Sequence, residues 1–168
     1  MIITAVQKRR TKVLLFFNNS QQLLINFEVF LSSGLYKGDS LDENKLNALV
    51  KNDEIFNAKN SAYRYLGNRN HSSFEIKQKL RKKGHPNHII ANLISDFKKN
   101  GYLNDLEFSH SFIQNRIERK HEGLIKIKSE LFKKGVHSEI ISYAIEKYTE
   151  SEVHYDNAKI LLGKKYSL

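Results

Sequence analysis

The sequence predicts a mainly α-helical protein, with tandem three-helix repeats in a solenoid-like array and a small N-terminal β-ribbon. The first observation is an internal repeat. The stretch 72–94 returns at 123–145, and nine of the 19 positions from 76 to 94 are identical after a shift of 51. A fixed period of this size is typical of repeat architectures. The second is the scarcity of helix breakers, with one proline and eight glycines in 168 residues.

The first 27 residues are predicted to form a small antiparallel ribbon. Runs rich in Ile, Val, Leu and Phe occupy residues 2–6, 12–17 and 22–27. Such short apolar runs favour strands. Asn18-Asn19-Ser20 separates the second run from the third and is a turn signal, so these two runs are predicted to pair as a hairpin.

A linker of helical character is expected after the ribbon. Residues 28–33 are predicted to make one helical turn closed by Gly34, because glycine accepts the left-handed conformation that ends a helix. Asp39 or Ser40 is expected to cap a short helix that continues into the linker. Residues 1–57 are therefore interpreted as a strand-rich segment and a linker helix.

The first three-helix repeat is predicted to span residues 58–101. Its second helix begins with a capping box, in which Ser72 and Glu75 each satisfy a backbone N–H of the other, and it ends at Gly84. Pro86 is expected in the first turn of the third helix. The residues expected to face inward on the second helix are Phe74, Ile76 and Leu80.

The second repeat is predicted to span residues 102–149, with Asp105 or Glu107 capping its first helix and Gly135 ending its second. Residues 150–168 are interpreted as the first helix of an incomplete third repeat. In that helix Ala158, Leu162 and Lys165 match apolar and basic positions of the earlier copies. No helix of this length is stable alone in water, so the helices must bury their apolar stripes against one another.

The positive charge of the chain is concentrated in the repeats. Lys and Arg number 28 against 18 Asp and Glu, for a net charge of +10. Residues 1–57 hold 7 basic and 6 acidic residues, whereas 58–168 hold 21 and 12. A basic face that recurs in successive units suits a linear polyanion, either nucleic acid or a protein filament formed on it.

Two clusters of basic side chains, one in each repeat, are the predicted binding residues. The first contains Arg64, Arg69, Lys77, Lys79, Arg81, Lys82 and Lys83, and the second contains Arg116, Arg119, Lys120, Lys126, Lys128, Lys133 and Lys134. A structural alternative applies to the lysines just before Gly84 and Gly135, because cations in the last helical turn complement the helix dipole. Seven cations per repeat exceed what capping requires.

Several aromatic residues lie near these charges and can in principle stack on bases. They are Tyr63, Tyr65, Tyr102, Phe108 and Phe112. At helical spacing, aromatic side chains more often belong to the core, and the core role is the favoured interpretation.

The sequence contains no pattern typical of an enzyme. There is no cysteine, which excludes disulfides, thiolate catalysis and zinc sites built on sulfur. HExxH, GxxxxGK, GxGxxG and GxSxG are all absent. We therefore expect a non-enzymatic protein with no cofactor and no metal. No apolar run approaches the length of a membrane span, and the first residues lack the charge order of a signal peptide, so a cytoplasmic location away from membranes is expected.

The repeat resembles the RecX family, the regulatory proteins of the RecA recombinase. The resemblance covers residues 58–168. It rests on the order of SSFEIKQKLRKKG at 72–84, GYLND at 101–105 and GLIKIKSELFKKG at 123–135, with a helical segment before each copy. GLYKGDSL at 34–41 is similar to the less distinctive start of the same family.

The resemblance implies an inhibitor that lies in the groove of the RecA filament on single-stranded DNA and restrains ATP hydrolysis, filament growth and strand exchange. It implies a role in homologous recombination, DNA repair and the SOS response, with weak non-specific binding of single-stranded DNA. A monomer is expected. Family members usually complete a third repeat, so a shorter array is expected to engage the filament less strongly. The alternative is a DNA-binding module of the helix-turn-helix kind, which three short helices also suit.

Overall fold

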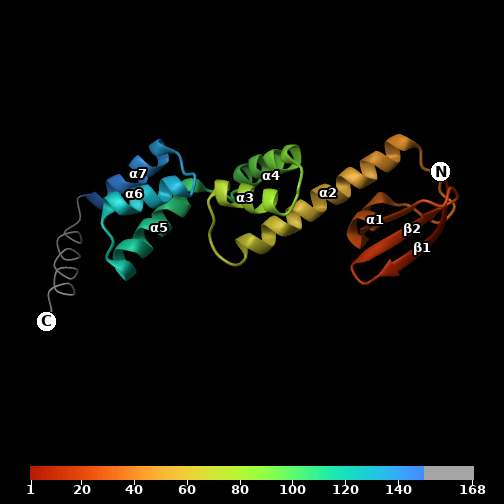
Figure 1. The fold of residues 1–168 in the computed structure, drawn as a ribbon, viewed down its shortest axis with the longest axis horizontal. Coiled ribbons are helices and arrows are strands. Elements are labelled where there is room, and N and C mark those ends of the chain that lie inside the picture. Colours follow the sequence, from red (N-terminus) through yellow and green to blue (C-terminus); the bar gives the residue numbers. More distant parts are fainter. Residues whose placement is uncertain (150–168) are drawn as a thin grey trace. The chain divides into compact units, whose positions relative to one another are not determined.

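The computed structural model describes residues 1–149. The chain divides into two compact units, Met1–Ser61 and the part that begins at Ala62. The first contains a three-stranded sheet, and the second contains the helical repeats (Figure 1). This confirms the predicted fold class, mainly helical with a small N-terminal ribbon.

The sheet is antiparallel with strand order β1-β2-β3. Its strands are β1 (Ile3–Arg9), β2 (Lys12–Phe17) and β3 (Gln22–Asn26). Side chains alternate between the two faces of a strand, so Val13, Leu15 and Phe17 of β2 point to the same face. All three are buried in the core of this unit. Strand β1 extends three residues beyond the predicted end and is followed by a turn of two residues before β2.

Helix α1 (Phe27–Ser33) packs against β2 and β3 through the buried side chain of Val29. It ends at Gly34, whose φ of 65° is the left-handed conformation predicted for it. The core of this unit also takes Leu41 and Leu49 from the chain that follows.

The predicted short helix, the linker of helical character and the first helix of the repeat form one continuous helix, α2 (Glu43–Leu66), so only the expected breaks between them are wrong. No glycine or proline interrupts this range, so nothing stops the helix between its ends. The residue that caps it is also different from the prediction. The Asp42 carboxylate accepts a hydrogen bond from the Lys45 N–H at 2.7 Å, whereas Asp39 binds the N–H of Tyr36.

The first repeat is completed by α3 (Ser73–Lys82) and α4 (Asn87–Lys99). The predicted capping box of Ser72 and Glu75 is present, and Gly84 has a φ of 83°. Pro86 precedes α4 as its N-cap instead of lying in its first turn. The buried residues of α3 and α4 include Ile76, Leu80, Ile89, Ile90, Leu93 and Phe97.

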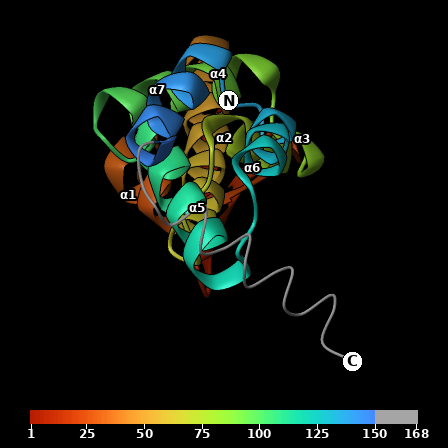
Figure 2. The same cartoon turned by 90° about the vertical axis from the view of Figure 1, so that its left-hand side faces the viewer.

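The second repeat consists of α5 (Asp105–Lys120), α6 (Leu124–Lys133) and α7 (Ser138–Thr149), which pack on one another (Figures 1 and 2). Their core contains Phe108, Ile113, Ile117, Ile127, Leu131, Val136, Ile141 and Ala144. The predicted cap of α5 is wrong: Asn104 accepts the backbone N–H groups of Leu106 and Glu107. Asp105 is then free to bind elsewhere.

The predicted helix of a third repeat, with Ala158, Leu162 and Lys165, lies outside the described residues. Within residues 1–149, every helix is too short or too polar to cross a bilayer.

Candidate functional site

The two repeats meet where the N-terminus of α3 faces the C-terminus of α6. The Ser72 hydroxyl donates a hydrogen bond of 2.6 Å to the backbone carbonyl of Lys134, the residue that follows the last turn of α6. The last carbonyls of a helix have no partner within the helix, so this bond satisfies one of them. We call this contact the junction. It comprises residues 72–75 on one side and Asp105, Lys134 and Gly135 on the other.

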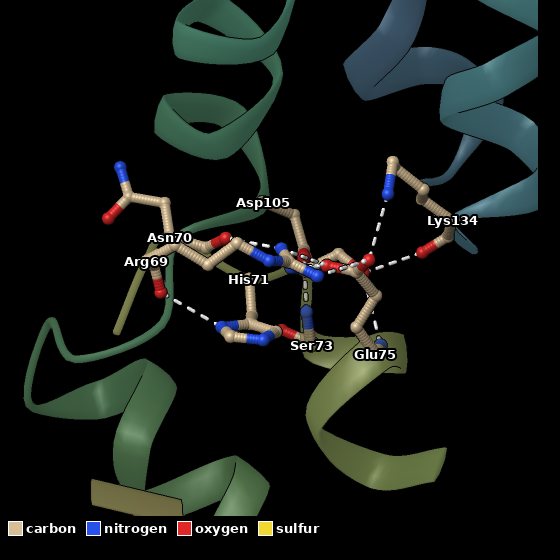
Figure 3. A network of polar contacts seen from close by, with 8 residues as sticks. Arg69, Asn70, His71, Ser73, Glu75, Asp105 and Lys134 are labelled. Atoms are coloured by element: carbon tan, nitrogen blue, oxygen red, sulfur yellow. Dashed lines mark hydrogen bonds and ion pairs between the residues drawn. The ribbon is translucent and has the colours of Figure 1, made fainter. Parts of the chain in front are cut away.

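Glu75 is the centre of the junction (Figure 3). Its carboxylate accepts two hydrogen bonds from the Arg69 guanidinium, at 3.0 and 3.1 Å, and one from the Lys134 ammonium at 2.8 Å. It also accepts the Ser72 backbone N–H. Burial by itself raises the pKa of Glu75, but the hydrogen bonds from Arg69 and Lys134 outweigh it and lower the pKa to about 2.

Asp105 forms a second polar link across the junction. Its carboxylate accepts the Ser73 N–H at 2.7 Å and lies 3.0 Å from the Lys98 ammonium. The first residue of α5 thus accepts a backbone N–H from the first turn of α3. A carboxylate is favoured there by the helix dipole. Figure 3 shows Asp105 and Lys134 approaching α3 from different elements.

An apolar contact completes the junction. A Cβ atom added to Gly135 would overlap the Cβ and ring of Phe74, so this glycine leaves the space that the phenylalanine occupies. Phe74 was predicted to face inward. That prediction is wrong: the side chain lies at the junction and is 41% exposed.

Truncating Phe74 is expected to destabilise the protein, whereas the same change at its repeat counterpart is not. Ile125 occupies the position of Phe74 after the shift of 51, but it is 90% exposed. Phe74→Ala should lower the free energy of unfolding by about 2 kcal/mol, and Ile125→Ala by less than about 0.5 kcal/mol. Urea unfolding of both variants measures the difference. Equal losses would contradict the packing role of Phe74.

An open groove of about 590 Å³ lies beside the junction. We call it the inter-repeat groove, and it is lined by Phe74, Glu75, Gln78, Lys79, Lys82, Arg116, Glu130, Lys133 and Lys134. Both repeats contribute cations to it. The helix ends that carry the repeated Lys-Lys-Gly sequence contribute the equivalent residues Lys82 and Lys133, and the second helix end also contributes Lys134.

The charges of the groove are not balanced. Its two carboxylates already have partners, because Glu75 binds Arg69 and Lys134, and Glu130 binds Arg116 at 2.8 Å. Lys79, Lys82 and Lys133 form no ion pair with the described residues. Three cations therefore line the groove with no carboxylate partner in the described part of the chain, and the ammonium of one of them, Lys79, also lies 4.7 Å from the centroid of the Tyr65 ring.

The structure separates the fourteen predicted binding cations into three groups. Those in ion pairs that hold the fold are Arg69, Arg116, Lys126 and Lys134. Those that line the groove without an ion pair are Lys79, Lys82 and Lys133. The remainder lie outside the groove lining and are Arg64, Lys77, Arg81, Lys83, Arg119, Lys120 and Lys128. The groove thus contains only some of the cations in the two predicted clusters.

Most of the aromatic residues considered for base stacking have partners in the fold. Tyr63 packs against Phe97 and Tyr102 with ring centroids 5.0 and 5.5 Å apart. Phe108 is 5% exposed, so it cannot stack on a base. Lys79 covers the ring of Tyr65, and Arg116 covers Phe112. Phe74, which was not among the predicted stacking residues, is the aromatic side chain that lines the groove.

Among residues 1–149, no three His, Asp or Glu side chains are grouped so as to hold a metal ion. The junction and groove instead have the features of a binding surface. Two three-helix repeats held together at the junction present cations that have no carboxylate partner among residues 1–149 along a groove, which defines a tandem three-helix-repeat protein with a basic groove.

Comparison with known proteins identifies the family. The family model described as the first three-helix domain of RecX matches residues 58–97, and that of the second matches residues 104–145. The chain belongs to the RecX family.

Several curated relatives carry the name regulatory protein RecX. The one from Clostridium acetobutylicum is 29% identical over 93% of this chain and 72% of its own length. That from Bacillus cereus is 33% identical over 84% of this chain. The chain spans about half the length of the Bacillus relatives, at 52%.

Two solved structures share the fold. A crystal structure of regulatory protein RecX gives a TM-score of 0.75 at 22% identity, covering 97% of this chain and 81% of the other. The crystal structure of RecX from Lactobacillus salivarius gives a TM-score of 0.63 at 25% identity, covering 68% of this chain and 76% of the other.

Proposed function

We propose that this protein is a non-enzymatic regulator of the RecA recombinase, and that it inhibits the enzyme by binding in the groove of the RecA filament on single-stranded DNA. The observation that carries the proposal is the inter-repeat groove, in which Lys79, Lys82 and Lys133 have no carboxylate partner among residues 1–149. Membership of a family whose named members are regulatory proteins supports it.

The junction supports a mechanism by bridging. Hydrogen bonds, ion pairs and the Phe74 contact fix one repeat against the next, so the spacing between the lysines of α3 and α6 is set before binding. A preorganised array loses less conformational freedom on binding than a flexible one. A body that contacts neighbouring subunits of a filament at a fixed spacing opposes the relative motion of those subunits, and ATP turnover and filament growth slow as a consequence.

The three groove lysines are proposed to contact phosphate or acidic side chains of the filament. Each is an ammonium group on a flexible four-carbon stem, which suits contacts that carry no sequence information, and Lys79 would leave its cation–π contact with Tyr65 to make them. Arg116 and Lys134 lie in the same groove, but their ion pairs assign them to the fold. Substitution of Arg116 or Lys134 would therefore not distinguish a loss of binding from a loss of stability.

The test is ATP hydrolysis by RecA on single-stranded DNA, with and without this protein. The wild-type protein is expected to slow ATP hydrolysis even when it is added in substoichiometric amounts relative to RecA. A variant with Lys79→Gln, Lys82→Gln and Lys133→Gln should require at least about tenfold more protein for the same inhibition, because three phosphate contacts are lost. The matched control replaces Lys37, Lys45 and Lys51 by Gln, three exposed lysines that precede the repeats and do not line the groove.

The outcomes separate two parts of the proposal. If the folded wild-type protein leaves hydrolysis and strand exchange unchanged, the regulatory function is wrong. If the groove variant inhibits as well as the control, the function stands and the groove is not the binding surface. Binding to one defined duplex sequence, with little response to salt, would instead favour a helix-turn-helix reader.

A further inference from the structure

The turn between β1 and β2 carries a second cluster of positive charge. Four of the five residues from 8 to 12 are basic, and all four are exposed: Lys8, Arg9, Arg10 and Lys12. None of them forms an ion pair with a carboxylate in residues 1–149. Residues 1–57 hold 7 basic and 6 acidic residues, so their small net charge conceals this cluster, which we call the hairpin tip.

The hairpin tip is held in place by contacts with α1. The carbonyl of Thr11 accepts a hydrogen bond of 2.9 Å from the Phe27 N–H, at the start of that helix. The Lys8 ammonium lies 4.0 Å from the centroid of the Phe27 ring, which is a cation–π contact. Lys8 thus helps to fix the turn. Arg10 and Lys12 remain available to a partner, as does Arg9, whose guanidinium makes one exposed hydrogen bond of 3.2 Å to the Gln7 side chain.

Two features of the hairpin tip are unfavourable for folding. Arg9 and Lys12 are directly paired across the two strands, and like charges in this position repel. Arg10 has a φ of 51°, a left-handed conformation that glycine or asparagine accepts more easily. Local choices that oppose folding are expected at functional sites. A charged edge strand protects against aggregation, but that purpose requires neither a cross-strand pair of like charges nor an arginine at a positive φ.

We propose that the hairpin tip binds the phosphate backbone of nucleic acid, through Arg9, Arg10 and Lys12. The repulsion between Arg9 and Lys12 is relieved when phosphates lie between them, and release of counterions from a polyelectrolyte adds a driving force. Arginine forms paired hydrogen bonds with phosphate oxygens. A membrane surface fits less well, because residues 8–12 contain no large apolar side chain to enter a bilayer. Binding to bare DNA needs no recombinase, so this proposal is independent of the function proposed above.

The test uses the full chain and fluorescence anisotropy of labelled DNA, with oligothymidylate and a mixed-sequence duplex as separate probes. A variant with Arg9→Gln, Arg10→Gly and Lys12→Gln should bind at least about tenfold more weakly, and its plot of log affinity against log salt should be shallower by about 2. Loss for oligothymidylate alone assigns the hairpin tip to single strands, and loss for both probes assigns it to any phosphate backbone. The control variant at Lys37, Lys45 and Lys51 removes the same charge from the same unit.

The single variant Arg10→Gly separates binding from folding. Glycine relieves the strain at φ 51°, so the melting temperature should rise by about 2–4 °C while affinity for DNA falls. Unchanged affinity for both DNA probes in the triple variant would overturn the proposal. So would an equal loss in the control variant, or binding of anionic phosphatidylserine vesicles through the hairpin tip without binding of DNA.

Discussion

Gly135→Ala is expected to destabilise the protein by about 3 kcal/mol, the largest effect of any single substitution considered. Two costs combine at this position. The residue has a φ of 70°, where alanine is strained, and the added Cβ would overlap the side chain of Phe74. Because Phe74 and Gly135 belong to different repeats, relief of the overlap requires the repeats to separate or the ring to leave its site.

Gly84→Ala is the matched control for this substitution. Gly84 ends α3 as Gly135 ends α6, it has a φ of 83°, and a Cβ atom there would meet nothing within 4 Å. It should therefore show the cost of the left-handed conformation alone, about 1 kcal/mol. Urea unfolding of both variants measures the difference. If the two glycines cost the same, the close contact between Phe74 and Gly135 contributes nothing to stability.

Glu75→Gln is expected to remove an acid-sensitive part of the stability. The pKa of Glu75 is about 2 in the folded protein against 4.5 ordinarily, so the folded state favours the charged carboxylate. A depressed pKa contributes stability that is present above about pH 5 and is lost as the pH falls towards 2. The Glu75 side chain is 16% exposed, but its partner Arg69 is half exposed. We therefore expect about 2 kcal/mol at neutral pH.

The measurement is the free energy of unfolding of wild type and Glu75→Gln as a function of pH. The difference between them should be largest at neutral pH and should decrease steadily between pH 5 and pH 2, the window set by the two pKa values. Glu139→Gln, which removes an exposed carboxylate from α7, controls for the loss of one negative charge. A difference between wild type and Glu75→Gln that stays constant with pH would contradict the ion-pair role of Glu75.

Local features of the fold could be predicted because they depend on neighbouring residues. The capping box joins Ser72 to Glu75 three residues away, and Gly84 and Gly135 end their helices through their own backbone conformation. One error arose where several local signals competed. Asp39, Asp42 and Ser40 are all suitable caps within four residues, and only the packing of the chain selects one.

The candidate binding surface could be predicted only in outline. Sequence alone identified fourteen cations as candidates but could not show which of them are used by the fold. Glu75 lies 59 residues from Lys134, and Asp105 lies 32 residues from Ser73. No local pattern reveals such pairs. The hairpin tip was missed for a different reason, since averaging charge over residues 1–57 concealed a cluster of four cations.

The sequence by itself determined the repeat, its helices and their end signals, and the excess of positive charge in the repeats. These features follow from the periodicity and composition of the sequence, because local structure depends mainly on neighbouring residues. The tertiary structure decided how the charges are used. The junction brings the end of one helix to the start of another, so Arg69 and Lys134 serve Glu75, while Lys79, Lys82 and Lys133 are left facing the groove. Whether a cation holds the fold or binds a partner depends on which carboxylates lie within reach, and only packing sets those distances.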